Sequence, residues 1–340
     1  MPPCELDWPR TSPPRLELRL TLPRVSVIIP NYNHARYLRQ RIGSVLGQTL
    51  GDMEVLILDD ASTDGSLEVI REFEGDPRVR VIVNETNSGS TFRQWNRGMR
   101  EAKGEYAWIA ESDDWADERF LERLVGMLEA NPGCGMACSE SWYVYGDDPP
   151  TTRTNDSHKP ENARWREDYV ADGREECREH LVVHNTMPNA SAVVMRRDLF
   201  ERVGGADESM RLCGDWMLWV RLLELSDLAH VGDPLNYYRC HTAAVRKKNL
   251  ASPSTQAEVY RIIAYIHRRM GVPPGKLEEV LAARGERFVT AAWEQKFGAA
   301  GAWKVYRAAR EVDSSAWRRI LLKWARMRAG SARRRLVAKG

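Results

Sequence analysis

Three acidic side chains gather directly behind an apolar stretch in the first half of the chain. Residues Tyr106–Ala110 are apolar or aromatic, which predicts a buried strand, and Glu111, Asp113 and Asp114 follow at once. Carboxylates this close together repel one another, so a metal ion, basic partners or a shared proton must stabilise them. From these residues alone, all three explanations remain open.

Three further apolar segments also end in polar residues that could bind a ligand. Strands are predicted at 25–29, 55–58 and 79–83. They are followed by Pro30-Asn31-Tyr32-Asn33, by Asp59-Asp60-Ala61-Ser62-Thr63-Asp64-Gly65 and by Asn84-Glu85-Thr86-Asn87-Ser88-Gly89. The first strand is followed by neither a GxGxxG turn nor a Walker A loop. Hydride transfer with a dinucleotide and P-loop phosphoryl transfer therefore lose their main support.

Helices must alternate with these strands to bring the polar ends together. The apolar periodicity predicts helices at 36–46, 66–73 and 91–102, with short connections to the strands. This alternation predicts an α/β fold with a mostly parallel sheet flanked by helices. Ligands bind such a sheet beyond the carboxyl ends of its strands, so the polar ends are expected to form one site.

The second half of the chain adds one more candidate catalytic segment. A helix is predicted at 118–130, strands at 135–145 and 190–195, and a helix at 198–203. The polar residues 146–176 between them predict a mobile loop over a site. Gly214-Asp215-Trp216 opens a strongly apolar helix, and a strand at 235–238 leads into Arg239-Cys240-His241. From about Ser252 onward the periodicity is helical.

Composition excludes several other classes of protein. The 340 residues carry a net charge of +2, too balanced to indicate a nucleic-acid-binding protein. The six cysteines form no CxxC pair, which disfavours zinc ribbons and disulfide scaffolds and fits a reducing cytosol. A signal peptide and an apolar run of about 20 residues, enough to span a bilayer, are both absent, so a cytoplasmic location is expected.

Four ordered motifs resemble one enzyme family. They are Val25-Ser26-Val27-Ile28-Ile29-Pro30-Asn31-Tyr32-Asn33, Leu58-Asp59-Asp60-Ala61-Ser62-Thr63-Asp64-Gly65, Glu111-Ser112-Asp113-Asp114 and Gly214-Asp215-Trp216. Their order and spacing are similar to those of the family 2 inverting glycosyltransferases with a GT-A fold, over roughly residues 24–242. The resemblance implies a catalytic domain at 24–250. The prolines within 1–23 predict an irregular lead-in there, and the helical periodicity predicts a helical C-terminal region at 251–340.

The resemblance also implies a role for each polar end. Asp215 corresponds to the general base, and Trp216 to a residue that contacts the acceptor. The nucleotide-sugar-binding residues that it implies are Pro30, Tyr32, Asn33, Asp60, Arg93, Asp113 and Arg239. The ligands that it implies for a divalent cation, Mn²⁺ or Mg²⁺, are Asp114 as the direct ligand, Asp113 and His241. Members often carry aspartate at the position of Glu111, so Glu111 receives only a supporting role.

Each of these residues also has a simpler structural explanation. Asp59 and Asp60 could be turn residues, Asp113, Asp114 and Asp215 helix caps, and His241 an ordinary structural histidine. Arg93 could be a solvated helix residue, and Trp216 could pack in the core. The co-occurrence of four motifs favours the functional interpretation.

The implied activity is transfer of a sugar from a nucleoside-diphosphate sugar, with UDP favoured, to a saccharide or lipid-linked acceptor in cell-surface polysaccharide synthesis. The alternatives are a nucleotidyltransferase and a non-catalytic sugar-nucleotide or membrane-surface binding protein. Residues 301–340 contain twelve Lys and Arg against two acidic residues. Their Trp and Leu residues suit either contact with the inner face of a membrane or packing on the catalytic domain. Nucleic acid is not an expected partner.

Overall fold

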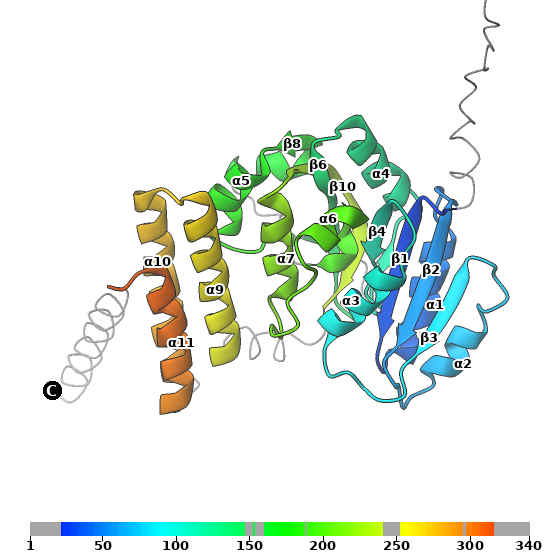
Figure 1. The fold of residues 1–340 in the computed structure, drawn as a ribbon, viewed down its shortest axis with the longest axis horizontal. Coiled ribbons are helices and arrows are strands. Elements are labelled where there is room, and N and C mark those ends of the chain that lie inside the picture. The colour runs from blue at the N-terminus through cyan, green and yellow to red at the C-terminus, as the bar shows by residue number, and fades with distance from the viewer. Residues whose placement is uncertain are drawn as a thin grey trace, which may run out of the picture.

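A mixed β-sheet forms the centre of the molecule (Figure 1). The computed structural model describes residues 22–146, 152–153, 160–187, 189–240, 252–294 and 297–315. Within them the sheet has ten strands in the order β3-β2-β1-β4-β9-β6-β10-β5, with β7 beside β6 and β8 beside β10. The strands are β1 Val25–Asn31, β2 Met53–Asp59, β3 Val79–Val83, β4 Tyr106–Ile109, β5 Trp115–Ala116, β6 Cys134–Val144, β7 Thr152–Arg153, β8 Tyr169–Ala171, β9 Val193–Arg196 and β10 Asp227–Arg239.

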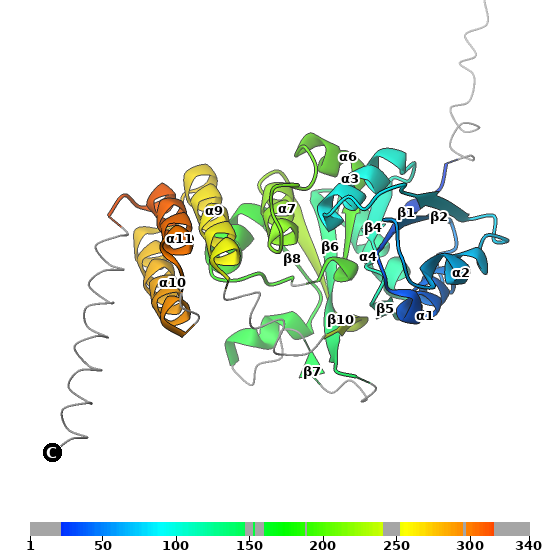
Figure 2. The same ribbon diagram turned by 90° about the horizontal axis from the view of Figure 1, so that it is seen from below.

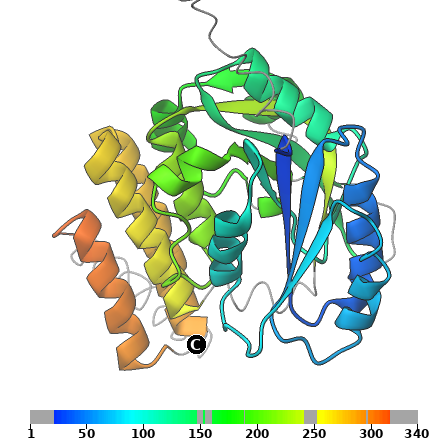
Figure 3. The same cartoon turned by 45° about the vertical axis from the view of Figure 1, so that its right-hand side comes forward.

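Helices cover both faces of this sheet (Figure 3). They are α1 Ala35–Leu46, α2 Ser66–Arg71, α3 Thr91–Glu101, α4 Phe120–Ala130, α5 Gly173–Glu176, α6 Arg197–Arg202, α7 Gly214–Leu223, α9 Pro253–Met270, α10 Pro274–Glu294 and α11 Ala299–Val312. Side chains of α1, α2 and α4 form one core with the sheet, and those of α3, α6 and α7 form the other. Because side chains alternate along a strand, Val27 of β1 enters the first core while Ile28 enters the second.

The four strands nearest the N-terminus are parallel and bring their carboxyl ends to one edge. Strand β1 pairs in parallel with β2 on one side and with β4 on the other, and β2 pairs in parallel with β3. The predicted α/β fold, with a parallel half flanked by helices, is thereby confirmed. Beyond β4 the sheet becomes mixed, since β9 runs antiparallel to both β4 and β6.

The C-terminal helices extend the second core. Figures 1 and 2 both show α9, α10 and α11 packed beyond α7. Tyr260 and Ile263 of α9 are fully or almost fully buried and belong to the same cluster as the side chains of α7. The described part of the helical extension therefore packs on the catalytic domain. The domain limits at residues 23 and 250 stay predictions.

One prediction about the middle of the chain was wrong, and another covered only part of the element. Residues 160–176 are folded rather than a mobile loop: β8 pairs with β10, Trp165 is buried, and the ring of Tyr169 stacks 4.7 Å from that of His230. The strand expected at 235–238 is confirmed, but it is only the end of the longer β10. Its pairing with β6 shifts register between Val231 and Pro234, where polar residues hide the apolar pattern.

Candidate functional site

The ends of β1 and β2 are joined by hydrogen bonds beneath the expected base-binding edge. The side-chain amide of Asn31 donates to one oxygen of Asp59 at 2.8 Å, and the backbone N–H of Ser62 donates to the other at 2.9 Å. Asp59 is fully buried. It therefore holds the two strand ends together, which is the turn role that the sequence left open.

Asp60 is fixed as an oriented acceptor at the same edge. Its Oδ1 accepts hydrogen bonds from the backbone N–H of Ser88 and the side-chain amide of Gln94, both at 2.8 Å. Its Oδ2 accepts from the Ser88 hydroxyl at 2.7 Å, and the side chain is only 5% exposed. Ser88 and Gln94, which follow the end of β3, thus hold this carboxylate rigidly.

The other residues expected to bind the nucleotide differ in how accessible they are. Tyr32 is 47% exposed just after β1, whereas Pro30 is buried within the strand. Asn33 has a left-handed φ of 58°, and its side-chain oxygen accepts from the backbone N–H of Thr63 at 2.7 Å. Asn33 therefore joins the loops after β1 and β2.

Arg93 lies at the rim of the same edge, on the first turn of α3. Its Nη1 donates to the backbone carbonyl of Ser88 at 2.9 Å, and its Nε lies 3.3 Å from the carboxylate of Glu208. More than half of its side chain is exposed. The guanidinium is thus close to the loop that fixes Asp60 and accessible to a ligand.

A buried arginine supplies positive charge next to the acidic cluster that follows β4. Nη2 of Arg41 lies 4.0 Å from Oδ2 of Asp114 and donates to the Ser191 hydroxyl at 2.9 Å, while Nε donates to the backbone carbonyl of Glu111 at 2.8 Å. Burial lowers the pKa of Arg41 to about 10, although the carboxylates around it raise it. Arg41 therefore stays cationic, and a basic partner is one of the three stabilising factors considered above.

Asp114 accepts three hydrogen bonds from within the protein. Its Oδ2 accepts from the Asn189 amide at 2.9 Å and from the Ser191 hydroxyl at 2.8 Å, and its Oδ1 accepts from the backbone N–H of Arg239 at 2.9 Å. Only 2% of the side chain is exposed. Burial and the neighbouring Asp113 raise its pKa to about 6. Three of the roughly four acceptor sites of this carboxylate are thus used inside the protein, and its role as the direct metal ligand stays a prediction.

Asp113 and Glu111 complete the cluster in different ways. Glu111 accepts a 2.8 Å hydrogen bond from the indole N–H of Trp95, while burial and then Asp113 raise its pKa to about 8. Asp113 is partly exposed, and its carbonyl accepts from Nε of Arg239 at 2.9 Å. The raised pKa values of Glu111 and Asp114 mean that a cation bound beside the cluster would be favoured. Within the part of the chain that the structure describes, no group of three His, Cys, Asp or Glu side chains forms a complete metal site.

Arg239 closes the cluster from the end of β10. Its Nη2 donates to Gln40 at 2.9 Å, and its guanidinium lies 4.4 Å from the ring centre of Tyr37 and 4.8 Å from that of Trp115. These contacts place a permanent positive charge next to Asp113. His241, two residues further on, lies outside the described residues.

Asp215 occupies the first turn of α7. Its Oδ1 accepts from the backbone N–H of Trp216 at 2.7 Å and its Oδ2 from the side-chain amide of Asn185 at 3.1 Å. Burial raises its pKa to about 7, against the effect of these two donors. The positive end of the helix dipole at the start of α7 favours the ionised form of this carboxyl. Desolvation outweighs that effect, and the resulting pKa suits a group that accepts a proton near neutral pH.

The two residues beside Asp215 have packing roles. A Cβ atom on Gly214 would lie 2.4 Å from the ring of Phe92, so only glycine lets α7 begin this close to α3. Trp216 is 5% exposed, and its indole N–H donates to the carbonyl of Leu181 at 3.0 Å. Trp216 therefore packs in the core, as the structural explanation expected, and its contact with an acceptor stays an untested prediction.

Sequence reasoning missed the residues that support these carboxylates. Arg41 lies among the apolar positions of the helix predicted at 36–46. From the sequence alone it cannot be told from the surface arginines of that helix. Asn185 and Asn189 lie in a segment without a regular pattern, and Ser191 lies in the predicted strand at 190–195, where nothing marks it as a partner of Asp114. The only signal for them was the requirement that the acidic cluster have a partner.

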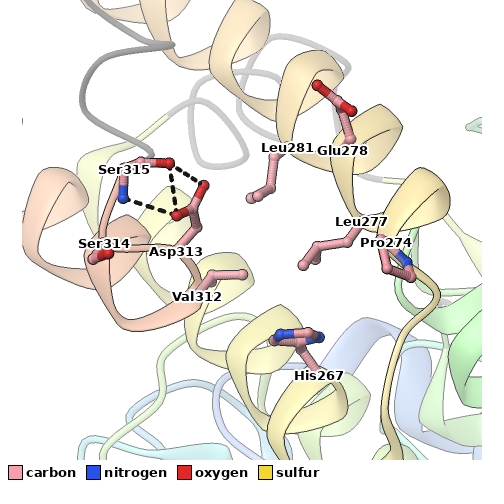
Figure 4. Close-up of a pocket in the computed structure, with 9 residues that line it drawn as sticks. All are labelled: His267, Pro274, Leu277, Glu278, Leu281, Val312, Asp313, Ser314 and Ser315. Carbon is pink, nitrogen blue, oxygen red and sulfur yellow. Dashed lines mark hydrogen bonds between the residues drawn. The ribbon is translucent and has the colours of Figure 1, made fainter.

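A hollow of about 480 Å³ lies away from this site, between α9, α10 and the end of α11 (Figure 4). The residues that line it are His267, Pro274, Leu277, Glu278, Leu281, Val312, Asp313, Ser314 and Ser315. None of them comes from the strand ends. The candidate site therefore rests on the carboxylates and their partners and not on this hollow.

The sequence and the fold both match known proteins. The sequence profile of "Glycosyl transferase family 2" matches residues 26–204. TuaG of Bacillus subtilis, named as a teichuronic acid biosynthesis glycosyltransferase, is 26% identical over 249 residues, which are 72% of this chain and 90% of TuaG. Other curated relatives match over shorter stretches, and the chain spans only 14% of the length of one of them.

Two solved structures show the same fold. S. aureus TarS 1–349 in complex with UDP-GlcNAc has a TM-score of 0.66 at 18% identity, over 86% of this chain and 82% of that one. The mannosyltransferase PcManGT from Pyrobaculum calidifontis, in complex with GDP-Man and Mn²⁺, has a TM-score of 0.57 at 16% identity, over 89% and 87%.

Proposed function

The chain belongs to glycosyltransferase family 2, and we propose that it moves a sugar from a UDP-sugar to a hydroxyl group of a saccharide or lipid-linked acceptor in cell-surface polysaccharide synthesis. TuaG and TarS support the choice of process and of nucleotide, since one is named for teichuronic acid biosynthesis and the other binds UDP-GlcNAc. The family match favours glycosyl transfer over the nucleotidyl transfer considered from the sequence.

Asp215 is the proposed general base, and its environment is the observation that carries the mechanism. In an inverting transfer the acceptor oxygen attacks the anomeric carbon from the face opposite the leaving diphosphate. The bond between that carbon and the phosphate oxygen breaks, and the acceptor proton passes to a carboxylate oxygen of Asp215. A pKa of about 7 leaves this group partly ionised at neutral pH and basic enough to take the proton.

The polar strand ends are the proposed donor site. Asp60, held by Ser88 and Gln94, presents a fixed acceptor to the N–H of a uracil ring, and exposed Tyr32 and buried Pro30 form the wall beside it. Arg93 at the rim and Arg239 beside the acidic cluster are placed to neutralise phosphate charge. Asn33 shapes the loop between them.

Asp113 is the proposed protein ligand of a divalent cation, Mn²⁺ or Mg²⁺, and His241 is retained as a second one. Asp113 is partly exposed, whereas the oxygens of Asp114 accept three hydrogen bonds within the protein. When bound, the cation would supply positive charge to the departing diphosphate. The residues present supply only part of a coordination shell, so donor phosphates would complete it.

The outer face of α11 is the proposed contact with the inner face of a membrane. Trp303 is 58% exposed and stacks on Tyr306 at 5.1 Å, and Arg307 and Arg310 are exposed on the same helix. An aromatic pair beside basic side chains suits the interface of an anionic bilayer. No helix in the described ranges has the length and apolarity to cross the bilayer.

A thermal-shift screen followed by one substitution tests this function. UDP-, GDP- and other nucleotide sugars are added with Mn²⁺, and the donor should raise the melting temperature by mass action. Turnover of that donor is then measured as release of its nucleotide. Asp215→Asn should abolish turnover and leave the affinity for UDP unchanged. Wild-type turnover in this variant would exclude Asp215 as the base.

A further inference from the structure

The loop before α7 is held by a carboxylate from the C-terminal helices. Glu258 of α9 is 6% exposed, and its Oε1 accepts from the backbone N–H of Arg211 at 2.8 Å. Its Oε2 accepts from the backbone N–H groups of Leu212 at 3.1 Å and Cys213 at 3.0 Å. Three consecutive peptide groups that immediately precede Gly214 and Asp215 thus depend on one side chain.

The opposite side of Asp215 is also connected to these helices. Asn185, which donates to Asp215, lies in a segment whose carbonyl groups at Leu181 and Met187 accept from the indole N–H groups of Trp216 and Trp219, at 3.0 and 3.2 Å. Arg284 of α10, which is 7% exposed, donates to the carbonyl of Val183 in the same segment and lies 5.7 Å from the ring of Trp216. Helices α9 and α10 therefore reach both flanks of the proposed base.

We propose that Glu258 is a positioning residue for Asp215, and that α9 and α10 are part of the scaffold of the active site. This inference rests on the proposed function of Asp215. Without the Glu258 carboxylate, the buried N–H of Cys213 and the partly buried N–H groups of Arg211 and Leu212 would lose their acceptor, and the loop would have to move for the Cys213 N–H to reach water. The start of α7 has little room for such a movement, because Gly214 already touches the ring of Phe92.

A small displacement of this loop is sufficient to affect transfer. A general base acts only within hydrogen-bond reach of the proton that it abstracts, roughly 2.6–3.2 Å between heavy atoms. Misplacement by about 1 Å can cost about 100-fold in rate. The donor site lies on the strand ends and shares no described hydrogen bond with Glu258, so the loss should fall on kcat and not on the binding of UDP.

The test compares Glu258→Gln, Glu258→Asp and the matched control Glu279→Gln in the full chain. Glu279 is an exposed glutamate on α10. Turnover is measured as UDP release from UDP-N-acetylglucosamine with Mn²⁺, UDP affinity by calorimetry, and the amides of residues 211–213 by hydrogen exchange. Glu258→Gln should lower kcat about 10- to 100-fold, leave the Kd of UDP within twofold and speed exchange at 211–213. Glu258→Asp keeps the carboxylate and should recover part of the turnover.

Several outcomes would overturn the proposal. A Glu258→Gln enzyme with the kcat of Glu279→Gln would do so, and so would kcat and UDP affinity falling together in both Glu258 variants. Asp215→Asn, measured in parallel, separates the two levels of the inference. If Asp215→Asn keeps full turnover, the proposed base and the positioning role both fail. If it loses turnover while Glu258→Gln does not, only the positioning role fails.

Discussion

The guanidinium of Arg41 lies 4.0 Å from the carboxylate of Asp114, with side chains that are 0% and 2% exposed. This pair lies under the acidic cluster and provides a permanent counter-charge to it. Asp114 in turn accepts the backbone N–H of Arg239 at 2.9 Å. The end of β10 is thereby tied to the loop after β4. These contacts fix the acidic cluster in place. Asp114 is its buried member, and Asp113 is partly exposed to solvent.

Removing the charge of Arg41 should destabilise the fold severely. Arg41→Met would leave buried Asp114 without its cation, and breaking a buried pair in this way typically costs about 3–5 kcal/mol. The free energy of unfolding from urea titration measures the effect. Arg71→Met, at an exposed position on α2, should change it by less than about 0.5 kcal/mol. Equal stability of the two variants would contradict a structural role for Arg41.

Activity should fall in acid as Asp215 becomes protonated. Its pKa of about 7 means that the ionised, proton-accepting form is lost as the pH drops below 7. At saturating Mn²⁺ and donor, kcat should therefore decrease about tenfold per pH unit well below that value. The pH profile of UDP release measures this. The affinity for UDP over the same range is the control, since an equal loss of affinity would attribute the acid limb to the donor site.

The raised pKa of Asp215 makes the fold less stable at the higher pH values at which it makes the enzyme more active. A carboxyl whose folded pKa is raised above its unfolded value favours folding at low pH, and that contribution is lost as the pH rises through about 7. Asp215→Asn should thus be more stable than the wild type above pH 7, by an amount on the order of 1–3 kcal/mol, and equal to it near pH 4. Denaturant unfolding at the two pH values distinguishes this from a general effect of the substitution. A variant that is less stable at pH 8 would contradict the raised pKa.

Gly214→Ala should disturb both packing and catalysis. The added Cβ would lie 2.4 Å from the Phe92 ring, so α7 or α3 must shift, at a cost of about 1–3 kcal/mol. Because Asp215 is the next residue, kcat should fall as well. Gly126→Ala in α4, where nothing lies within 4 Å, is the matched control and should be neutral or slightly stabilising. Recovery of turnover in Gly214→Ala with Phe92→Leu would confirm the contact as the cause.

The sequence predicted the parallel half of the fold because each of its strands alternates cleanly with an amphipathic helix. It also placed Asp60, Asp113 and Asp215 at element ends, where ligands bind α/β sheets. It could not show that Asp114 faces inward, because the partners that decide this, Arg41 and Ser191, lie far away along the chain. Trp216 was ambiguous for a similar reason. A tryptophan beside a polar motif suits both a sugar platform and a core, and the sequence does not show that its indole N–H donates to the carbonyl of Leu181.

The α11 face should bind anionic vesicles. Trp303 and Tyr306 would enter the interface while Arg307 and Arg310 stay at the level of the headgroups, each worth about 1 kcal/mol near an anionic surface. The wild-type protein should therefore sediment together with phosphatidylglycerol vesicles at low salt. Trp303→Ser with Arg307→Glu should reduce the bound fraction, and Arg71→Glu on α2 should not. Equal loss in both variants would indicate a general charge effect.

Metal binding should depend on Asp113 and stability on Asp114. Asp113→Asn removes a partly exposed carboxylate, so the Mn²⁺-dependent gain in UDP affinity should fall at least tenfold while the melting temperature changes little. Asp114 accepts three hydrogen bonds. In Asp114→Asn the new side-chain NH₂ group would face either the amide donor of Asn189 or the backbone N–H of Arg239, so that two donors meet without an acceptor. It should therefore lower the free energy of unfolding by about 1–3 kcal/mol. Calorimetry of UDP with and without Mn²⁺, beside urea unfolding, resolves the two effects. Loss of the metal-dependent affinity in a well-folded Asp114→Asn protein, with Asp113→Asn unaffected, would return the ligand role to Asp114.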